Sequence, residues 1–143
     1  LYLMKNNILK FWGVLDNALV SFLPQKAQFE ILKSSLYKKK CSLAFYSLED
    51  EYTYLNNASL IKKLYEKPKV NGFIFFSLLQ ISYKKNQNLE LIEKILSKNY
   101  EVIFYRENIH FKNLKSFKKE KKKISLFRHL NIDLIKKQQS LIN

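Results

Sequence analysis

Four short apolar runs divide the chain, and each segment between them is long enough to hold a helix. The runs are residues 11–15, 41–46, 73–76 and 102–105. Parallel strands cannot be joined by tight turns and need crossover connections of a dozen or more residues. Apolar residues at helical spacing predict a helix in each connection, namely Phe29, Leu32 and Leu36 after Pro24, then Ala58, Ile61, Leu64 and Tyr65, then Leu89, Ile92, Ile95 and Leu96.

This order of elements predicts an α/β protein with three layers, in which a doubly wound and mainly parallel sheet of four to five strands is followed by C-terminal helices. A chain of 143 residues fits one domain. We expect residues 1–111 to form the α/β sheet domain. Residues 112–143 are expected to form a lysine-rich helical extension, packed on or trailing that domain. The segment 109–111 is either a short extra strand or a turn, and a last helix is expected from Asn131.

Cysteine content and hydropathy indicate a soluble cytoplasmic protein. Cys41 is the single cysteine, so no disulfide forms within the chain. It is expected to be a small buried residue at the start of a strand. The apolar stretch 8–23 is interrupted by Lys10 and Asp16, is shorter than the ~20 residues of a membrane span, and lacks a signal-peptide cleavage pattern. Because residue 1 is Leu, the chain is a fragment, uses an alternative start codon, or truly begins at Met4.

The formal net charge of +14 is carried almost entirely by lysine. Arg106 and Arg128 are the two arginines, and the abundance of Lys, Asn, Ile, Phe and Tyr is typical of an AT-rich genome. Residues 111–143 hold +8 of the +14. This segment is a candidate nucleic-acid surface, through Lys115, Lys118, Lys119, Lys121, Lys122 and Lys123. Contact with anionic lipid and a merely solvated lysine face are the alternatives. Scarce arginine argues against base-specific readout.

The carboxyl ends of the predicted strands are the expected place for function. In an open parallel sheet, ligands bind outside these ends, near the switch in strand order. The rule nominates the polar residues that follow the strands, which are Asp16, Asn17, Ser47, Glu49, Ser77, Gln80, Arg106 and Glu107. The alternative for each is a loop residue that solvates the edge of the sheet.

Several chemistries lack their motifs. Gly13 and Gly72 are the only glycines, so a glycine-rich phosphate loop is not expected. His110, His129 and Cys41 are not spaced as zinc ligands, and no G-x-S-x-G motif is present. The acidic run 49–51 is either a source of a general acid or base or a solvated loop. We therefore expect no cofactor and no metal, and the sequence assigns no catalytic residue.

Four segments in one order resemble the sporadic carbohydrate cluster proteins, a bacterial family found in gene clusters for cell-surface polysaccharide or lipopolysaccharide synthesis. The matches lie within about residues 11–111. Gln25 and Gln28 match the family's P-Q-x-x-Q, and Glu51-Tyr52 matches its E-Y pair after Ser47 with one residue added. The run from Asn71 to Gln80 matches its third-strand signature, and Glu107 matches its acid after the fourth strand. A Ser-Arg pair of the family is replaced by Leu15-Asp16.

The predicted topology also looks like the N-terminal catalytic domain of serine recombinases. There a serine just past the first strand is the nucleophile and arginines support it, whereas this chain has Asp16-Asn17 at that place and two arginines in all. Phosphoryl transfer of that kind needs several arginines around the anionic centre. We expect the likeness to be one of fold alone.

The family resemblance implies an accessory protein of cell-surface carbohydrate biosynthesis. It would bind a sugar or sugar-nucleotide, or a partner enzyme of glycan synthesis, at the strand carboxyl ends, and a homo-oligomer is possible. The expected ligand-binding residues are Gln25, Gln28, Ser47, Glu51, Tyr52, Ser77, Gln80 and Glu107. The alternative is a nucleic-acid-binding module that uses the basic C-terminal segment.

Overall fold

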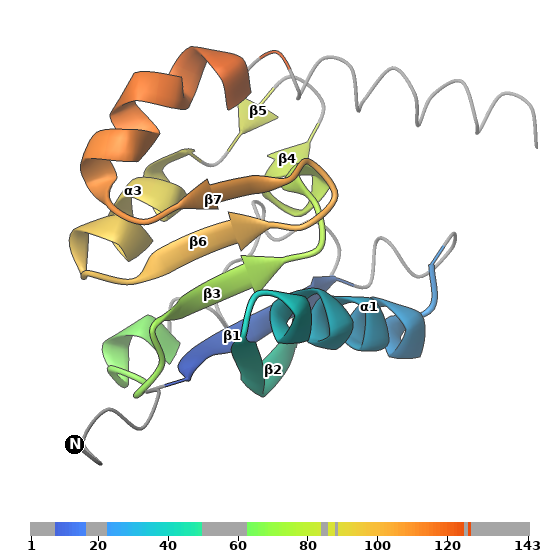
Figure 1. The fold of residues 1–143 in the computed structure, drawn as a ribbon. Helices are drawn as coiled ribbons and strands as arrows, with labels where there is room; N and C mark the ends of the chain where they lie inside the picture. The colour runs from blue at the N-terminus through green and yellow to red at the C-terminus, as the bar shows by residue number, and fades with distance from the viewer. Residues whose placement is uncertain are drawn as a thin grey trace, which may run out of the picture.

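A five-stranded sheet forms the centre of the protein, with strands in the order β2-β1-β3-β6-β7 (Figure 1). The computed structural model describes residues 8–16, 23–49, 63–83, 86–87, 89–124 and 126. Four strands are parallel, namely β1 (Leu9–Asp16), β2 (Cys41–Glu49), β3 (Gly72–Phe75) and β6 (Glu101–Phe104). The short strand β7 (Ile109–Phe111) runs antiparallel to β6. The predicted mainly parallel α/β sheet is confirmed.

Helices cover both faces of the sheet and make the three layers. The helix α1 (Gln25–Lys38) connects β1 to β2 and buries Leu32 and Leu36 against one face. The helix α3 (Leu89–Ser97) connects β3 to β6 and packs on the other face (Figure 1). Residues 114–124 form a further helix after β7, with Phe117 and Ile124 in the same apolar cluster as α3.

Some elements were not anticipated, and some predicted elements fall outside the described residues. A 3-10 turn, η3 (Leu78–Ile81), follows β3, and β4 (Ser82–Tyr83) pairs with β5 (Asn86–Gln87) in a separate two-stranded ribbon. Of the helix predicted over 57–66, residues 63–65 are helical and 57–62 lie outside the described residues. The helix predicted from Asn131 also lies outside them.

The central strand β3 is buried on both faces, as its continuous apolar sequence predicts. Phe73 and Phe75 point into the cluster beneath α3, while Ile74 packs beneath α1. At its start, a Cβ added to Gly72 would lie 2.4 Å from the Glu101 carbonyl oxygen and 2.8 Å from the Phe11 ring. Glycine at this position therefore permits the close approach of β3 to its neighbours.

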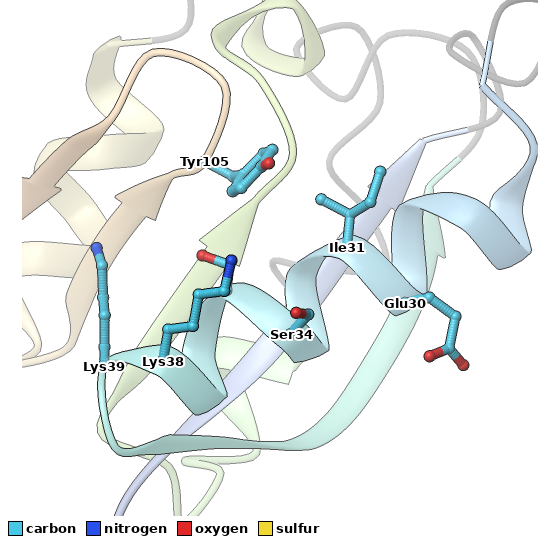
Figure 2. A pocket seen from close by; sticks show the side chains of 7 residues that line it. Glu30, Ile31, Ser34, Lys38, Lys39 and Tyr105 are labelled. Atoms are coloured by element: carbon cyan, nitrogen blue, oxygen red, sulfur yellow. The ribbon is translucent and has the colours of Figure 1, made fainter.

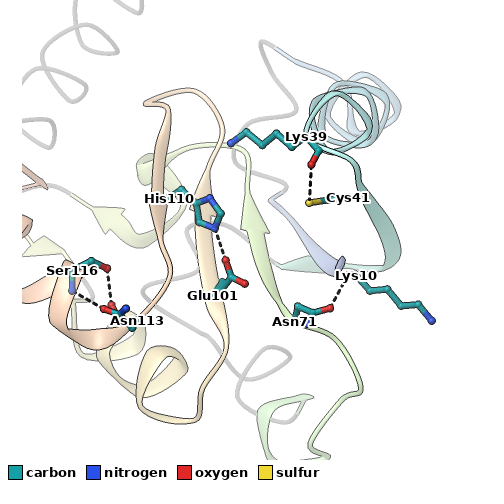
Figure 3. Close-up of polar contacts among 8 residues, drawn as sticks. All are labelled: Lys10, Lys39, Cys41, Asn71, Glu101, His110, Asn113 and Ser116. Atoms are coloured by element: carbon teal, nitrogen blue, oxygen red, sulfur yellow. Dashed lines mark hydrogen bonds and ion pairs between the residues drawn. The ribbon is translucent and has the colours of Figure 1, made fainter. Parts of the chain in front are cut away.

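Polar contacts fix the ends of two elements. The backbone of Asn71 exchanges hydrogen bonds with Lys10 and Glu101, and its side-chain Oδ1 accepts one from the Lys10 N–H at 2.8 Å (Figure 3). These bonds set the register of β1, β3 and β6 at their amino ends. Asn113 caps the helix 114–124, because its Oδ1 accepts a hydrogen bond from the Ser116 N–H at 2.9 Å.

Within the described part of the chain, no helix combines the length and the apolar character that crossing a membrane requires.

Candidate functional site

The switch in strand order lies between β1 and β3. After β1 the chain passes to α1 on one face of the sheet, and after β3 it passes toward α3 on the opposite face (Figure 1). In doubly wound sheets this divergence opens a crevice at the carboxyl ends, where ligands bind. The segments that follow β3 and β6 therefore form the described part of the candidate site.

Ser77 and Gln80 tie the segment after β3 to the end of β1. The Gln80 Nε2 donates to the Val14 carbonyl at 2.7 Å, and its Oε1 accepts from the Ser77 N–H at 3.0 Å. The Ser77 hydroxyl oxygen accepts from the Leu79 N–H at 3.2 Å. Both side chains are buried, with exposed fractions of 0% and 1%. Such groups stabilise a fold when they are paired, because burial without a partner is costly.

Glu107 joins the turn after β6 to the same segment. Its two carboxylate oxygens accept from the Ser77 hydroxyl at 2.8 Å and the Leu78 N–H at 2.9 Å. Burial raises the pKa of Glu107 above its ordinary value, although these hydrogen bonds and the nearby Arg106 act to lower it. Backbone bonds from Tyr105 and Arg106 to the end of β3 complete the attachment. The turn 105–108 is thus held rigidly against the sheet.

Three of the eight predicted ligand residues therefore come together, as a network of the buried Ser77 and Gln80 with the partly buried Glu107 rather than as an open lining. Of the others, Gln25 lies half-exposed at the start of α1, and Gln28 is buried with its Nε2 donating to the Leu23 carbonyl. Ser47 lies on β2, where its hydroxyl accepts from the Trp12 indole N–H at 3.0 Å. The remaining two predicted residues, Glu51 and Tyr52, lie outside the described residues, as do Asn17 and the side chains of Asp16 and Glu49.

A groove between α1 and the turn 105–108, termed the α1 groove, was not predicted (Figure 2). It consists of two adjoining hollows of about 530 and 460 Å³ that share Ser35, Lys39 and Tyr105. The full lining is Glu30, Ile31, Ser34, Ser35, Lys38, Lys39, Ile103, Phe104, Tyr105, Arg106 and Asn108. The two walls come from segments about 70 residues apart in the chain.

The lining of the α1 groove is cationic and rich in hydrogen-bonding groups. The lining includes three cations, Lys38, Lys39 and Arg106, and one carboxylate, Glu30. Ser34 and Ser35 add hydroxyls from α1. Lys38 and Lys39 lie at the carboxyl end of α1, where cations suit the helix dipole, and they were not among the predicted ligand residues. The signal that could have found the groove is the i, i+4 spacing of Ser34 with Lys38 and Ser35 with Lys39.

The amino ends of the strands hold a second polar cluster beneath α1 (Figure 3). Glu101 and His110 lie 2.6 Å apart. Burial, and then the Glu101 charge, raise the pKa of the Cys41 thiol, and Lys39 lowers it. A raised pKa disfavours the nucleophilic thiolate. Cys41 begins β2 as predicted, but it is only partly buried rather than buried. Within the described residues, no three His, Cys, Asp or Glu side chains are grouped to hold a metal ion.

The lysines of the C-terminal segment project from the helix 114–124. Phe117 and Ile124 face the core, while Lys115, Lys118, Lys119, Lys121, Lys122 and Lys123 are exposed. A shallow hollow is lined by Leu114 with Lys115, Lys118 and Lys119. Lys121 forms an ion pair with Glu93 of α3 at 3.2 Å. The basic surface is therefore attached to the domain through a buried face of the same helix.

No family model matches the chain, and no curated protein matches it in sequence. The resemblance to the sporadic carbohydrate cluster proteins, and the residue roles that it implies, stay predictions.

Substituting Glu107 tests the network. Glu107→Ala removes an acceptor from the Leu78 N–H and the Ser77 hydroxyl, so we expect the free energy of unfolding to fall by about 2–3 kcal/mol. Glu107→Gln keeps an acceptor and should cost less. Burial raises the pKa of Glu107 in the folded protein. The protonated form of Glu107 therefore stabilises the fold at low pH, and this contribution to the free energy of unfolding is lost as pH rises above the ordinary carboxyl pKa of about 4.3.

The advantage of wild type over Glu107→Gln should therefore shrink as pH rises, which urea unfolding at a series of pH values would measure. Glu120→Gln, at an exposed position on the helix 114–124, controls for the loss of a carboxylate. A difference between wild type and Glu107→Gln that does not change with pH would contradict this assignment.

Proposed function

We propose that this protein is an accessory protein of cell-surface carbohydrate biosynthesis that binds a sugar-nucleotide in the α1 groove, beside the carboxyl end of β6. Arg106 follows the carboxyl end of β6, where α/β folds bind ligands, while Lys38 and Lys39 reach the groove from the end of α1 that leads into β2. The resemblance to the sporadic carbohydrate cluster proteins supports the ligand class. The observation that carries the proposal is the convergence of Lys38, Lys39 and Arg106 on one groove.

Three cations in one groove favour a ligand with two adjacent phosphates. Charge-assisted hydrogen bonds from lysine and arginine to phosphate oxygens are shorter and stronger than those between neutral groups. The backbone of Arg106 is fixed by its N–H bond to the Phe76 carbonyl, so binding would need to order only the side chain. Each hollow also falls within the range of roughly 300–1,000 Å³ that small-molecule sites occupy. A nucleoside diphosphate sugar has the charge and the size for this groove.

The neutral groups of the groove suit the rest of such a ligand. Ser34, Ser35 and Asn108 offer hydroxyl and amide partners for sugar hydroxyls. The Tyr105 ring is 39% exposed at the groove and offers an aromatic face for a nucleobase or a sugar ring. Glu30 lies at the end away from Arg106 and would accept hydrogen bonds from the sugar rather than meet a phosphate.

In this proposal Ser77, Gln80 and Glu107 are positioning residues. They hold the turn 105–108 in place and do not line the groove. Both carboxylate oxygens of Glu107 are engaged, which leaves neither placed to act on a ligand. The proposed role is therefore binding, and it assigns no chemical step to these groups.

Calorimetric titration against uridine, guanosine and thymidine diphosphate sugars tests the proposal. We expect at least one to bind, and Arg106→Gln to weaken it by about tenfold or more, since each lost charged contact is worth on the order of 1.5–3 kcal/mol. Lys39→Gln should act in the same direction. Lys26→Gln, which removes the same charge from another position on α1, should leave the affinity unchanged. Binding of none of these ligands, or equal binding by Arg106→Gln, would contradict the proposal.

A nucleic-acid-binding role is a second candidate, favoured by the arrangement of lysines on the helix 114–124. Lys115, Lys118, Lys119 and Lys122 recur at i, i+3, i+4 and i+7, which places them along one face of a helix. Phe117 and Ile124 hold the opposite side in the core. A rigid row of cations can neutralise consecutive phosphates of a nucleic acid.

Salt-titrated binding to duplex DNA and to single-stranded RNA tests this candidate. Replacing Lys115, Lys118 and Lys119 with Gln should reduce the slope of log affinity against log salt concentration by about 2–3, because each lysine releases about one counterion. Substitution is preferable to deletion of 112–143, which would also remove Phe117 and Ile124 from the core. A slope that the triple substitution does not change would exclude this surface, and the matched triple replacement of Lys26, Lys33 and Lys67 is the control.

A further inference from the structure

β2 is the longer of the two edge strands of the described sheet. β2 is nine residues long and pairs with β1 alone, and no described strand lies on its other side. The opposite edge of the sheet, β7, has only three residues. Natural proteins often keep edge strands short because a long free edge pairs readily with another chain. The length of β2 as an edge strand is therefore unusual, whereas the length of β7 is not.

β2 lacks the residues that usually protect an edge. Lysine and proline are the common means of blocking edge-to-edge pairing, and this chain has 26 basic residues among 143. The stretch 41–61 nevertheless contains no Lys, Arg or Pro. β2 therefore differs from the lysine-rich surface of the rest of the protein. Genome composition does not explain this difference, because lysine is common in the sequence before residue 41 and after residue 61.

β2 also exposes an aromatic side chain on each face of the sheet. Phe45 is 55% exposed and stacks on Trp12 with ring centroids 5.2 Å apart. Tyr46 is 51% exposed and contacts Phe29 of α1, with ring centroids 5.1 Å apart. Each ring is held by its neighbour and still presents apolar surface at the edge. Rigid, half-exposed aromatic residues are enriched at the centres of protein interfaces.

The charges that flank β2 indicate which partner fits it. Lys38, Lys39 and Lys40 precede the strand, and Glu49 ends it, followed in sequence by Asp50 and Glu51. A strand with a basic amino end and an acidic carboxyl end is complementary to itself when the copies run antiparallel. A parallel copy would place like charges together. We propose that β2 pairs antiparallel with β2 of a second copy of this chain, which joins the two sheets into one of ten strands.

The bulge in β2 selects the register of this pairing. Phe11 pairs with Leu43 and Trp12 with Phe45, so Ala44 is the additional residue. The additional residue reverses the alternation of side chains between the two faces of β2. With a twofold axis between Ala44 and Phe45, each residue before the bulge therefore lies opposite a residue after the bulge that points to the same face of the sheet. This axis sets Leu43 opposite Tyr46, Ser42 opposite Ser47 and Cys41 opposite Leu48 along the backbone. The two Phe45 rings then flank the axis, and the lysines that precede each β2 in the sequence come near the acidic carboxyl end of the other copy.

The self-complementary interface is isologous, as expected of a twofold dimer. The pairing uses the outer edge of β2, whereas the α1 groove lies between α1 and the turn 105–108, although Lys38 and Lys39 both line the groove and precede β2 (Figures 1 and 2).

Sedimentation equilibrium on the full chain, over a range of concentrations, tests the proposal. The monomer is 17.2 kDa, and we expect a species of twice that mass. Lys40→Glu or Glu49→Lys alone should weaken the dimer by about tenfold or more at low salt, since each makes the charges at the facing strand ends more alike. The double variant Lys40→Glu/Glu49→Lys should restore dimerisation. Phe45→Lys should give a monomer, while Tyr37→Lys, at an 82% exposed position on α1, should not.

The charge-reversal variants keep the test decisive if Phe45→Lys fails to fold, because Lys40 is exposed and its change removes no core contact. A wild type that remains monomeric at millimolar concentration would overturn the proposal. A dimer that all of these variants leave intact would overturn it as well, since its interface would then lie elsewhere.

Discussion

The carboxylate of Glu107 is the contact on which the candidate site depends. It joins the turn after β6 to the segment after β3, and Gln80 joins that segment to the end of β1. Three strand ends are thus connected by paired side chains, of which Gln80 is buried and Glu107 is partly buried. Removing one partner would leave others buried without a hydrogen bond, which gives the network its rigidity. The same rigidity places Arg106 in the wall of the α1 groove.

The positions of the lysines indicate the candidate binding surfaces of this protein better than its net charge does. Lysines gather along the exposed face of the helix 114–124 and at the end of α1, whereas β2 has none. An AT-rich genome supplies lysine throughout a sequence, but it does not decide which surfaces lack it. The proposed binding surfaces all rest on such local contrasts: cations that converge on a groove, a row of lysines on one helix face, and an edge strand that has no lysine or proline.

The fold could be predicted because its signals are local. The apolar run at 73–76 marks a strand buried on both faces, and Leu32 with Leu36 marks the buried side of α1. The direction of β7 could not be predicted, since a segment as short as 109–111 carries no periodicity that separates a strand from a turn.

The candidate site was predictable only in part. The rule for strand carboxyl ends correctly brings Ser77, Gln80 and Glu107 together, but it does not say that their polar atoms face one another. The α1 groove escaped prediction because Lys39 and Arg106 are distant in sequence and meet only through the packing of α1 on the sheet. Contacts of that kind depend on tertiary structure, which no local pattern encodes.

Amide hydrogen exchange in the wild type and in Glu107→Ala measures the central claim, that Glu107 holds the wall of the groove. We expect the amides of Leu78 and Arg106 to be protected in the wild type and to lose protection together in the variant. The amide of Ile74, in the central strand, should stay protected in both. If Arg106 keeps its protection while Leu78 loses it, other contacts hold the turn 105–108, and the positioning role assigned to Glu107 is wrong.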